Sequence, residues 1–155
     1  MSNRAIALLV GILMTTMLVA AGCGGDDEDS LTKAEFVKQA NAICTAGDEE
    51  INQRLESFLK ENEPSGQRLT DAQLTEGAEE VLLPSLRKQV DKIAALGTPS
   101  EDGEEAEEIV QGAEEALEEV EDEPALAAPQ TGDRNPFAEV NEKAREYGLD
   151  VCGSE

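Results

Sequence analysis

The chain has 155 residues, of which 3% are aromatic and none is His or Trp, and its 35 acidic and 12 basic side chains give a formal charge of −23. Without His, the chain lacks the usual general base at neutral pH and the commonest metal ligand, which excludes His-dependent catalytic triads and zinc sites. The excess of acid argues against nucleic acid as a partner, because binding to the phosphate backbone needs Lys and Arg. The length suits a single domain.

The first 22 residues have the layout of an export signal. Arg4 is their only charged side chain, and an apolar run follows it. The run ends in a segment that resembles the lipobox of bacterial lipoproteins, with Ala20 where Leu is commonest: Val19-Ala20-Ala21-Gly22-Cys23. The resemblance implies that Cys23 is alkylated with diacylglycerol and becomes the mature N-terminus. It places the protein at the cell membrane, lipid-anchored on the extracytoplasmic face.

Two other interpretations of this leader stay open. The small residues before Cys23 also suit ordinary signal peptidase, which would release a soluble protein, and the 18 residues from Ala5 to Gly22 could remain as a spanning helix. The three cysteines favour lipidation, because an odd thiol is unfavourable in an oxidising compartment. If Cys23 carries lipid, Cys44 and Cys152 are left to pair with each other.

We therefore divide the chain into three parts. Residues 1–22 are a signal peptide, residues 23–31 are the lipidated Cys and a flexible acidic tether, and residues 32–155 form one helical domain. Residues 24–30 contain four acids and no apolar side chain, so they have no means of packing.

From Thr32 onward, apolar residues recur at helical spacing, and the strand-like alternation of apolar and polar residues is missing. The first helix begins at a capping box, Thr32 with Glu35, and extends to the break at residues 64–66. Its apolar face consists of Phe36, Ala40, Ile43, Gly47, Ile51, Leu55 and Phe58. Asn41, close to this face, is either a buried polar residue or partly exposed.

The second helical segment begins at another capping box, Thr70 with Gln73, and ends at Gly97 and Pro99. Pro84 lies inside it. Because an interior Pro costs about 3 kcal/mol, we expect a kink or a broken first half. In so acidic a chain, the basic cluster of this segment is expected to pair internally: Arg87, Lys88 and Lys92.

The third segment, roughly residues 101–120, depends on burial of its apolar stripe. Thirteen acids and no base lie within residues 101–123, and like charges four residues apart oppose a helix. The stripe consists of Ala106, Ile109, Val110, Ala113, Leu117 and Val120. A last helix is expected to begin with Asn135 as its cap and Pro136 at its first position, and to end at Gly148, with Tyr147 as a cap over the core.

Four helices with one apolar stripe each, joined by short loops, predict an all-α fold, an antiparallel four-helix bundle. In this order the last helix ends near the start of the first, which brings Cys152 within reach of Cys44. A disulfide between them would close a loop of roughly 100 residues and contribute about 4 to 5 kcal/mol in the chain-entropy model. Such a staple suits a bundle with few aromatic residues and a large net charge.

Three short patterns occur along the mature part: Phe36-x-x-x-Ala40-x-Ala42-Ile43-Cys44, Ala95-Leu96-Gly97-Thr98-Pro99 and Tyr147-Gly148-Leu149-x-x-Cys152-Gly153. They resemble the patterns of small, uncharacterised helical lipoproteins typical of actinobacteria. The resemblance supports the fold and the membrane location, and it implies no activity.

The strongest candidate site in the sequence is the acidic face of the third helix. It could collect divalent cations or dock a basic partner, with candidate metal ligands Glu104, Glu108, Glu115 and Glu119. Carboxylates on one helix face rarely converge six oxygens on one ion, and the sequence has no calcium-loop pattern. A solvated surface with weak, diffuse cation binding is therefore preferred.

Three classes of function follow. We favour a non-catalytic, lipid-anchored module that needs no cofactor and has the membrane and an unidentified envelope protein as partners. The alternative is a binder of divalent cations or small cationic ligands, in the bundle or on its acidic face. A hydrolase with paired carboxylates ranks last, because helical bundles with short loops offer few clefts. An apolar pocket between helices, with one or two converging polar groups, would favour the binder.

Overall fold

The computed structural model describes residues 30–62, 69–127 and 134–154. The predicted signal peptide, Cys23 and the tether as far as residue 29 lie outside the described residues. Within the described ranges the protein is all-helical, as predicted, and contains no strand. Among the helices of these ranges, none has the length and apolar character needed to cross a bilayer.

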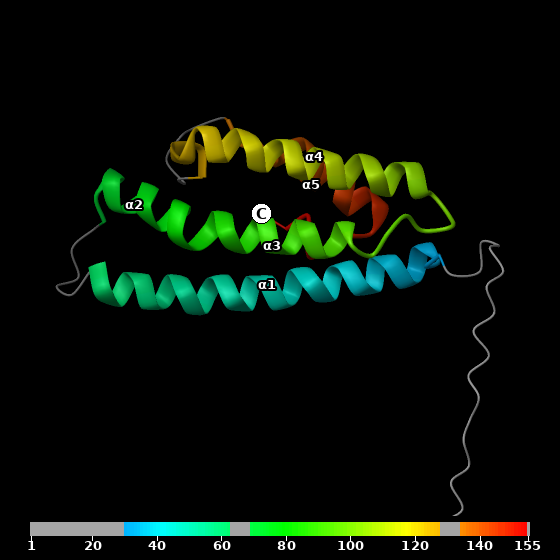
Figure 1. The fold of residues 1–155 in the computed structure, drawn as a ribbon, viewed down its shortest axis with the longest axis horizontal. Coiled ribbons are helices and arrows are strands. Elements are labelled where there is room, and N and C mark those ends of the chain that lie inside the picture. Colours follow the sequence, from blue (N-terminus) through cyan, green and yellow to red (C-terminus); the bar gives the residue numbers. More distant parts are fainter. Residues whose placement is uncertain (1–29, 63–68, 128–133, 155) are drawn as a thin grey trace, which may run out of the picture.

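Three layers of helix make up the fold (Figure 1). The first is α1, and the second is a rod formed by α2, the π-helix η1 and α3, which packs against both α1 and α4. The third contains α4, the 3₁₀-helix η2 and the short α5, which packs on α4. Their bounds are α1 Lys33–Asn62, α2 Asp71–Gly77, η1 Ala78–Leu82, α3 Leu83–Ala94, α4 Gly103–Asp122, η2 Pro124–Ala127 and α5 Ala138–Tyr147.

Helix α1 begins at the predicted capping box. The backbone N–H of Thr32 donates to Glu35 Oε2 at 3.1 Å, and the N–H of Glu35 donates to Thr32 Oγ1 at 3.3 Å. Hydrogen bonding to Thr32 lowers the pKa of Glu35. The second predicted capping box, Thr70 with Gln73, is also present and opens α2.

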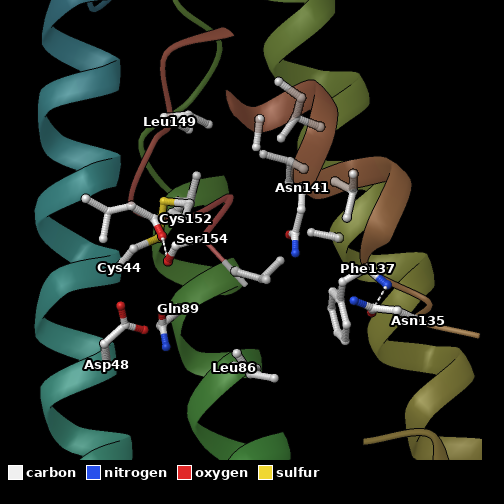
Figure 2. Close-up of a pocket in the computed structure, with 18 residues that line it drawn as sticks. Cys44, Asp48, Leu86, Gln89, Asn135, Phe137, Asn141, Leu149, Cys152 and Ser154 are labelled. Atoms are coloured by element: carbon white, nitrogen blue, oxygen red, sulfur yellow. Dashed lines mark hydrogen bonds between the residues drawn. A yellow bond between two sulfur atoms is a disulfide. The ribbon is translucent and has the colours of Figure 1, made fainter. Parts of the chain in front are cut away.

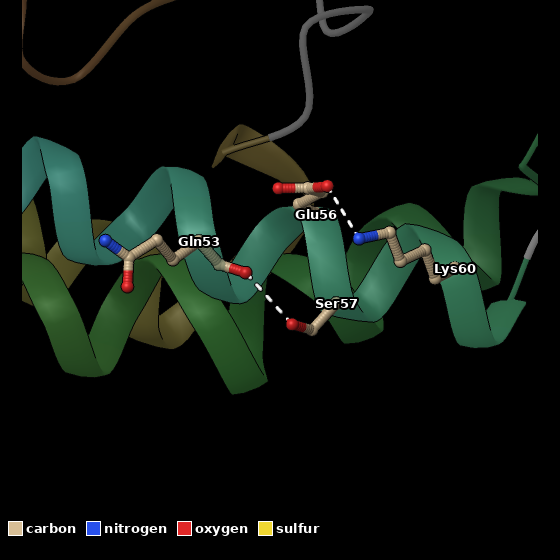
Figure 3. A network of polar contacts seen from close by, with 4 residues as sticks. All are labelled: Gln53, Glu56, Ser57 and Lys60. Atoms are coloured by element: carbon tan, nitrogen blue, oxygen red, sulfur yellow. Dashed lines mark hydrogen bonds and ion pairs between the residues drawn. The ribbon is translucent and has the colours of Figure 1, made fainter.

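The outer face of α1 is polar and held by local contacts (Figure 3). Lys60 Nζ lies 2.6 Å from Glu56 Oε1, and Ser57 Oγ donates to the carbonyl of Gln53 at 3.0 Å. Exposed pairs four residues apart contribute only about 0.3 to 0.5 kcal/mol. The stability of α1 therefore comes mainly from its inner face, where Phe36, Ala40, Cys44, Gly47 and Phe58 are buried.

Pro84 does not break the second segment. The backbone stays helical through the π-helix η1, where the N–H of Leu83 donates to the carbonyl of Ala78, five residues back. Pro84 has no N–H to donate to the carbonyl of Glu80, four residues back. The guanidinium of Arg54 on α1 donates to that carbonyl instead, and also to Ser85 Oγ at 2.9 Å.

The last helix begins later than predicted. Asn135 Oδ1 accepts a hydrogen bond from the N–H of Phe137 at 2.9 Å, but residues 136–137 form a turn and α5 starts at Ala138. Asn135 and Pro136 therefore belong to the turn before α5, and neither of them is the first residue of the helix. The end at Gly148 is as predicted, and this residue has φ 108°, a left-handed conformation that favours Gly.

The main core lies between α1, α3, α4 and α5. Tyr147 is buried in it as expected, with its ring edge-to-face against Phe36 at a centroid distance of 6.2 Å, and Lys33 Nζ lies 4.1 Å from the ring centre. The buried members are Phe36, Ala40, Cys44, Ile93, Ala106, Ile109, Val140, Ala144, Tyr147 and Leu149. A second cluster, around Leu83, Leu117 and Val120, packs α3 against α4.

The predicted pairing of Cys44 with Cys152 is confirmed. The disulfide joins the middle of α1 to the segment after α5, across a Cα–Cα distance of 5.3 Å and a sequence separation of 108. It fixes the C-terminal segment, residues 148–154, against α1.

Candidate functional site

A cavity of about 270 Å³ lies where α1, α3, α4, α5 and the C-terminal segment meet (Figure 2). Its walls are mainly apolar and come from helices far apart in the sequence, for example Ile93, Ile109, Val110, Phe137, Val140 and Leu149. An apolar cavity of about 150 Å³ can hold benzene. This cavity is therefore large enough for a ligand with one ring and a short substituent.

One wall depends on a close contact between α1 and α3. A Cβ atom at Gly47 would lie 2.1 Å from Cδ of Gln89, so only glycine lets the Gln89 side chain lie against the backbone of α1. Gln89 is 7% exposed and contributes to the cavity wall. Its Nε2 is buried and has no hydrogen-bond partner among the described residues. A buried polar atom left unpaired costs about 1 to 3 kcal/mol.

Asp48 is the only charged residue among the described residues that line the cavity. It follows Gly47 on α1 and is half-buried, and Figure 2 shows its carboxyl beside the Gln89 amide. Within the part of the chain that the structure describes, its carboxyl has no hydrogen bond or ion pair. Burial raises the pKa of Asp48, because desolvation disfavours the charged form.

The side of the cavity formed by α5 is mainly apolar and carries one uncharged polar group. Asn141 on α5 points its amide toward the cavity in Figure 2, and Asn135 lies nearby beside Phe137. The amide of Asn135 is engaged by the N–H of Phe137. The cavity thus has a carboxylate on the α1 side and an amide on the α5 side, with apolar side chains between them.

The C-terminal segment closes the cavity next to the disulfide. Asn41 on α1 donates through Nδ2 to the carbonyl of Gly148 and accepts through Oδ1 from the N–H of Val151, both at 3.0 Å. Arg145 on α5 donates to the carbonyl of Gly153 at 2.5 Å. These contacts, together with the Cys44–Cys152 bond, determine the shape of the cavity wall.

The acidic face of α4 has a different character. Glu104, Glu108 and Glu115 are exposed, and Glu119 forms an ion pair with Arg134. Three of the four predicted ligands border a groove between α4 and α5: Glu108, Glu115 and Glu119. Among the residues described, no group of three or more acidic or Cys side chains is arranged to hold a metal ion.

Arg87 and Lys88 of the basic cluster pair internally, as expected, whereas Lys92 is exposed and forms no ion pair within the described residues. Nη2 of Arg87 lies 2.7 Å from Glu121 Oε1 on α4, and Lys88 Nζ lies 2.6 Å from Glu50 Oε2 on α1. The Glu121 carboxylate raises the pKa of Arg87, and the hydrogen bond from Lys88 lowers the pKa of Glu50. These cations are therefore engaged on the surface and do not reach Asp48.

The sequence interpretation missed Asp48, Gln89 and Asn141. A signal was present for Gln89, because it is a polar residue three positions after Leu86 and four before Ile93, on an apolar helix face. For Asp48 and Asn141, no signal was present, because their place in the cavity wall depends on which helix lies opposite.

Comparison of the chain with protein-family models, curated proteins and solved structures finds no match.

Proposed function

We propose that this protein is a lipid-anchored, extracytoplasmic and non-catalytic binding protein that holds a small, mainly apolar molecule in its interhelical cavity. The cavity carries the proposal, since small-molecule sites are concave and mainly apolar, with a few polar groups that orient the ligand. Its volume of about 270 Å³ is close to the lower end of their usual range, about 300 Å³, so the ligand is small.

This favours the ligand-binding hypothesis over a module that acts through protein contacts alone. It also moves the binding site from the acidic face of α4 to the interior of the domain. A paired-carboxylate hydrolase would need two acids across a cleft, and Asp48 is the only acid among the described residues that line the cavity. An unidentified envelope protein remains as a proposed partner that delivers or receives the ligand.

The anchor in this proposal is Cys23. The lipobox pattern supports its lipidation, and the Cys44–Cys152 bond leaves Cys23 as the one cysteine outside the disulfide. A structural disulfide also suits an oxidising, extracytoplasmic location. Two acyl chains make a stable membrane anchor.

We further infer that the helices form an antiparallel four-helix bundle in which α5 is a short fourth helix. The contacts of α1 with α3, α3 with α4 and α4 with α5 support this arrangement. In it, the cavity lies between helices, where ligands of helical bundles are commonly held.

Calorimetric titration with benzyl alcohol tests the binding function. The protein is purified from cells that express the full sequence, and is held in nanodiscs if it is membrane-bound. We expect one saturable site in the wild type, a loss of at least tenfold in affinity for Ala113→Leu, and unchanged affinity for Ala42→Leu. Ala113 lines the cavity, whereas Ala42 is exposed on α1, so the control adds the same volume outside it. Circular dichroism checks that both variants fold. Absence of a saturable isotherm in the wild type, or wild-type affinity in Ala113→Leu, would contradict the proposal.

The anchor is tested separately by intact-mass measurement and membrane fractionation. We expect a mature chain that begins at Cys23 and carries a diacylglyceryl group, and a Cys23→Ser variant that leaves the membrane fraction. A wild-type mass that retains residues 1–22, or an unmodified Cys23, would overturn lipidation and leave the cavity hypothesis untouched.

A further inference from the structure

We propose that the ligand of the cavity is a protonated amine with a compact apolar body, and that the Asp48 carboxylate is its counter-ion. The inference rests on the proposed binding function and deepens it by naming the chemical class of ligand. Asp48 carries it, because this carboxylate is the only charge among the described residues that line an otherwise apolar and amide-lined cavity.

The carboxylate of Asp48 lacks a partner of its own within the described residues. Asp48 is half-buried, and this partial desolvation disfavours its charged form and raises its pKa, so a cationic partner would stabilise the carboxylate. Arg87 and Lys88 of the facing helix α3 donate to Glu121 and Glu50 instead. A cation supplied by a ligand would therefore complete a pair that the protein leaves incomplete.

The neighbouring amide can serve a donor-rich head group through its oxygen only, because its Nε2 is itself an unpaired donor. An ammonium ion has several N–H donors and no acceptor, and Gln89 lies in the wall next to Asp48. One ammonium could thus donate to the carboxylate and to the oxygen of a rotated Gln89 amide. An anionic head group would instead be repelled by the unpaired carboxylate of Asp48.

The charge of the whole chain acts in the same direction. A formal charge of −23 produces a negative potential that concentrates cations near the surface and repels anions. The rest of the ligand is mainly apolar, because most of the space beyond Asp48 is bounded by apolar side chains such as Ile109, Val140 and Leu149, with the Asn141 amide as a polar group on the α5 side. A ring or a branched alkyl group fits this description.

The test compares benzylamine with benzyl alcohol, two ligands of nearly equal shape that differ in charge at neutral pH. Each is titrated by calorimetry into the wild type, Asp48→Asn and Glu49→Gln, with empty nanodiscs subtracted where nanodiscs are used. Glu49 is exposed and adjacent to Asp48 on α1, so the control removes the same charge without touching the cavity.

We expect wild-type protein to bind benzylamine about tenfold to a hundredfold more tightly than benzyl alcohol, the range of one hydrogen bond to a charged group. Asp48→Asn removes that preference, whereas Glu49→Gln changes it by less than about twofold. Equal affinities of the wild type for the two ligands would overturn the amine assignment. Saturable binding of benzyl alcohol in that case would still support the binding function of the cavity. Equal loss of the preference in both variants would trace it to net charge and overturn the role of Asp48. The comparison of ligands on the wild type stands even if Asp48→Asn fails to fold.

Discussion

Asn41 Oδ1 accepts a hydrogen bond from the backbone N–H of Val151 at 3.0 Å, across 110 residues of sequence. The amide nitrogen Nδ2 of Asn41 donates to the carbonyl of Gly148. One side chain of α1 therefore satisfies two backbone groups of the C-terminal segment, on either side of buried Leu149. This contact and the disulfide together hold the wall of the cavity in place.

Replacement of Asn41 should destabilise the protein. In Asn41→Ala both backbone groups lose their partner, and each such loss costs about 1 to 3 kcal/mol, so we expect the free energy of unfolding to fall by about 2 kcal/mol or more. Asn52→Ala, an exposed position on the same helix, should cost less than about 0.5 kcal/mol. Urea unfolding followed by circular dichroism measures both, and equal losses would show that the Asn41 contacts contribute nothing.

Reduction of the disulfide should lower the free energy of unfolding by about 4 to 5 kcal/mol. The Cys44–Cys152 bond has a sequence separation of 108, and cross-links across so long a loop strongly restrict the unfolded chain. Urea unfolding with and without dithiothreitol measures the difference. The double variant C44A/C152A should match the reduced protein and be insensitive to reductant, and a wild-type curve that reductant leaves unchanged would refute the role of the staple.

Arg54 should be coupled energetically to Pro84. Arg54→Ala leaves the carbonyl of Glu80 without its guanidinium donor, and we expect a loss of about 1 to 3 kcal/mol. Pro84→Ala restores a backbone N–H four residues after that carbonyl. In this background the cost of Arg54→Ala should be smaller by about 1 kcal/mol, as measured by a double-mutant cycle of urea unfolding. Strict additivity of the two substitutions would contradict the account of the π-helix.

Asp48 should make the protein less stable as pH rises. Burial raises the pKa of Asp48 above its ordinary value of 3.8, so the folded state retains this proton to a higher pH than the unfolded state does. Stability is therefore lost as pH rises from 3.8 through the raised pKa. Relative to wild type, Asp48→Asn should gain free energy of unfolding between about pH 3 and pH 7. A constant difference between Asp48→Asn and wild type across this range would show that Asp48 is not desolvated.

Local signals in the sequence predicted the starts of α1 and α2 and the apolar faces of α1 and α4. The capping boxes at Thr32 and Thr70 involve residues three positions apart, and the stripes of α1 and α4 follow one helical period, so neither depends on a distant part of the chain. The Cys44–Cys152 pair was also predicted, because it followed from the order of the helices. The caps and stripes are thus set locally, whereas the disulfide prediction already needed an assumed arrangement of the helices.

The cavity and the π-helix were not predicted, since both depend on residues that meet only in the folded protein. The π-helix is supported by Arg54 from another helix, which no analysis of residues 78–84 alone could reveal. Gly47 was identified as part of an apolar face, but its role depends on the Gln89 side chain opposite it. The cavity results from the incomplete filling of space between four helices and the C-terminal segment.

A methyl NMR titration of the wild-type protein with benzyl alcohol tests most directly whether the cavity binds a ligand. We expect saturable shifts with one common dissociation constant for the methyl groups of Ile109, Val140 and Leu149, which line the cavity. The methyl groups of Leu59 and Leu74, outside the cavity lining, should not shift. Shifts that do not saturate, or equal shifts in both groups, would contradict the claim that this cavity is a binding site.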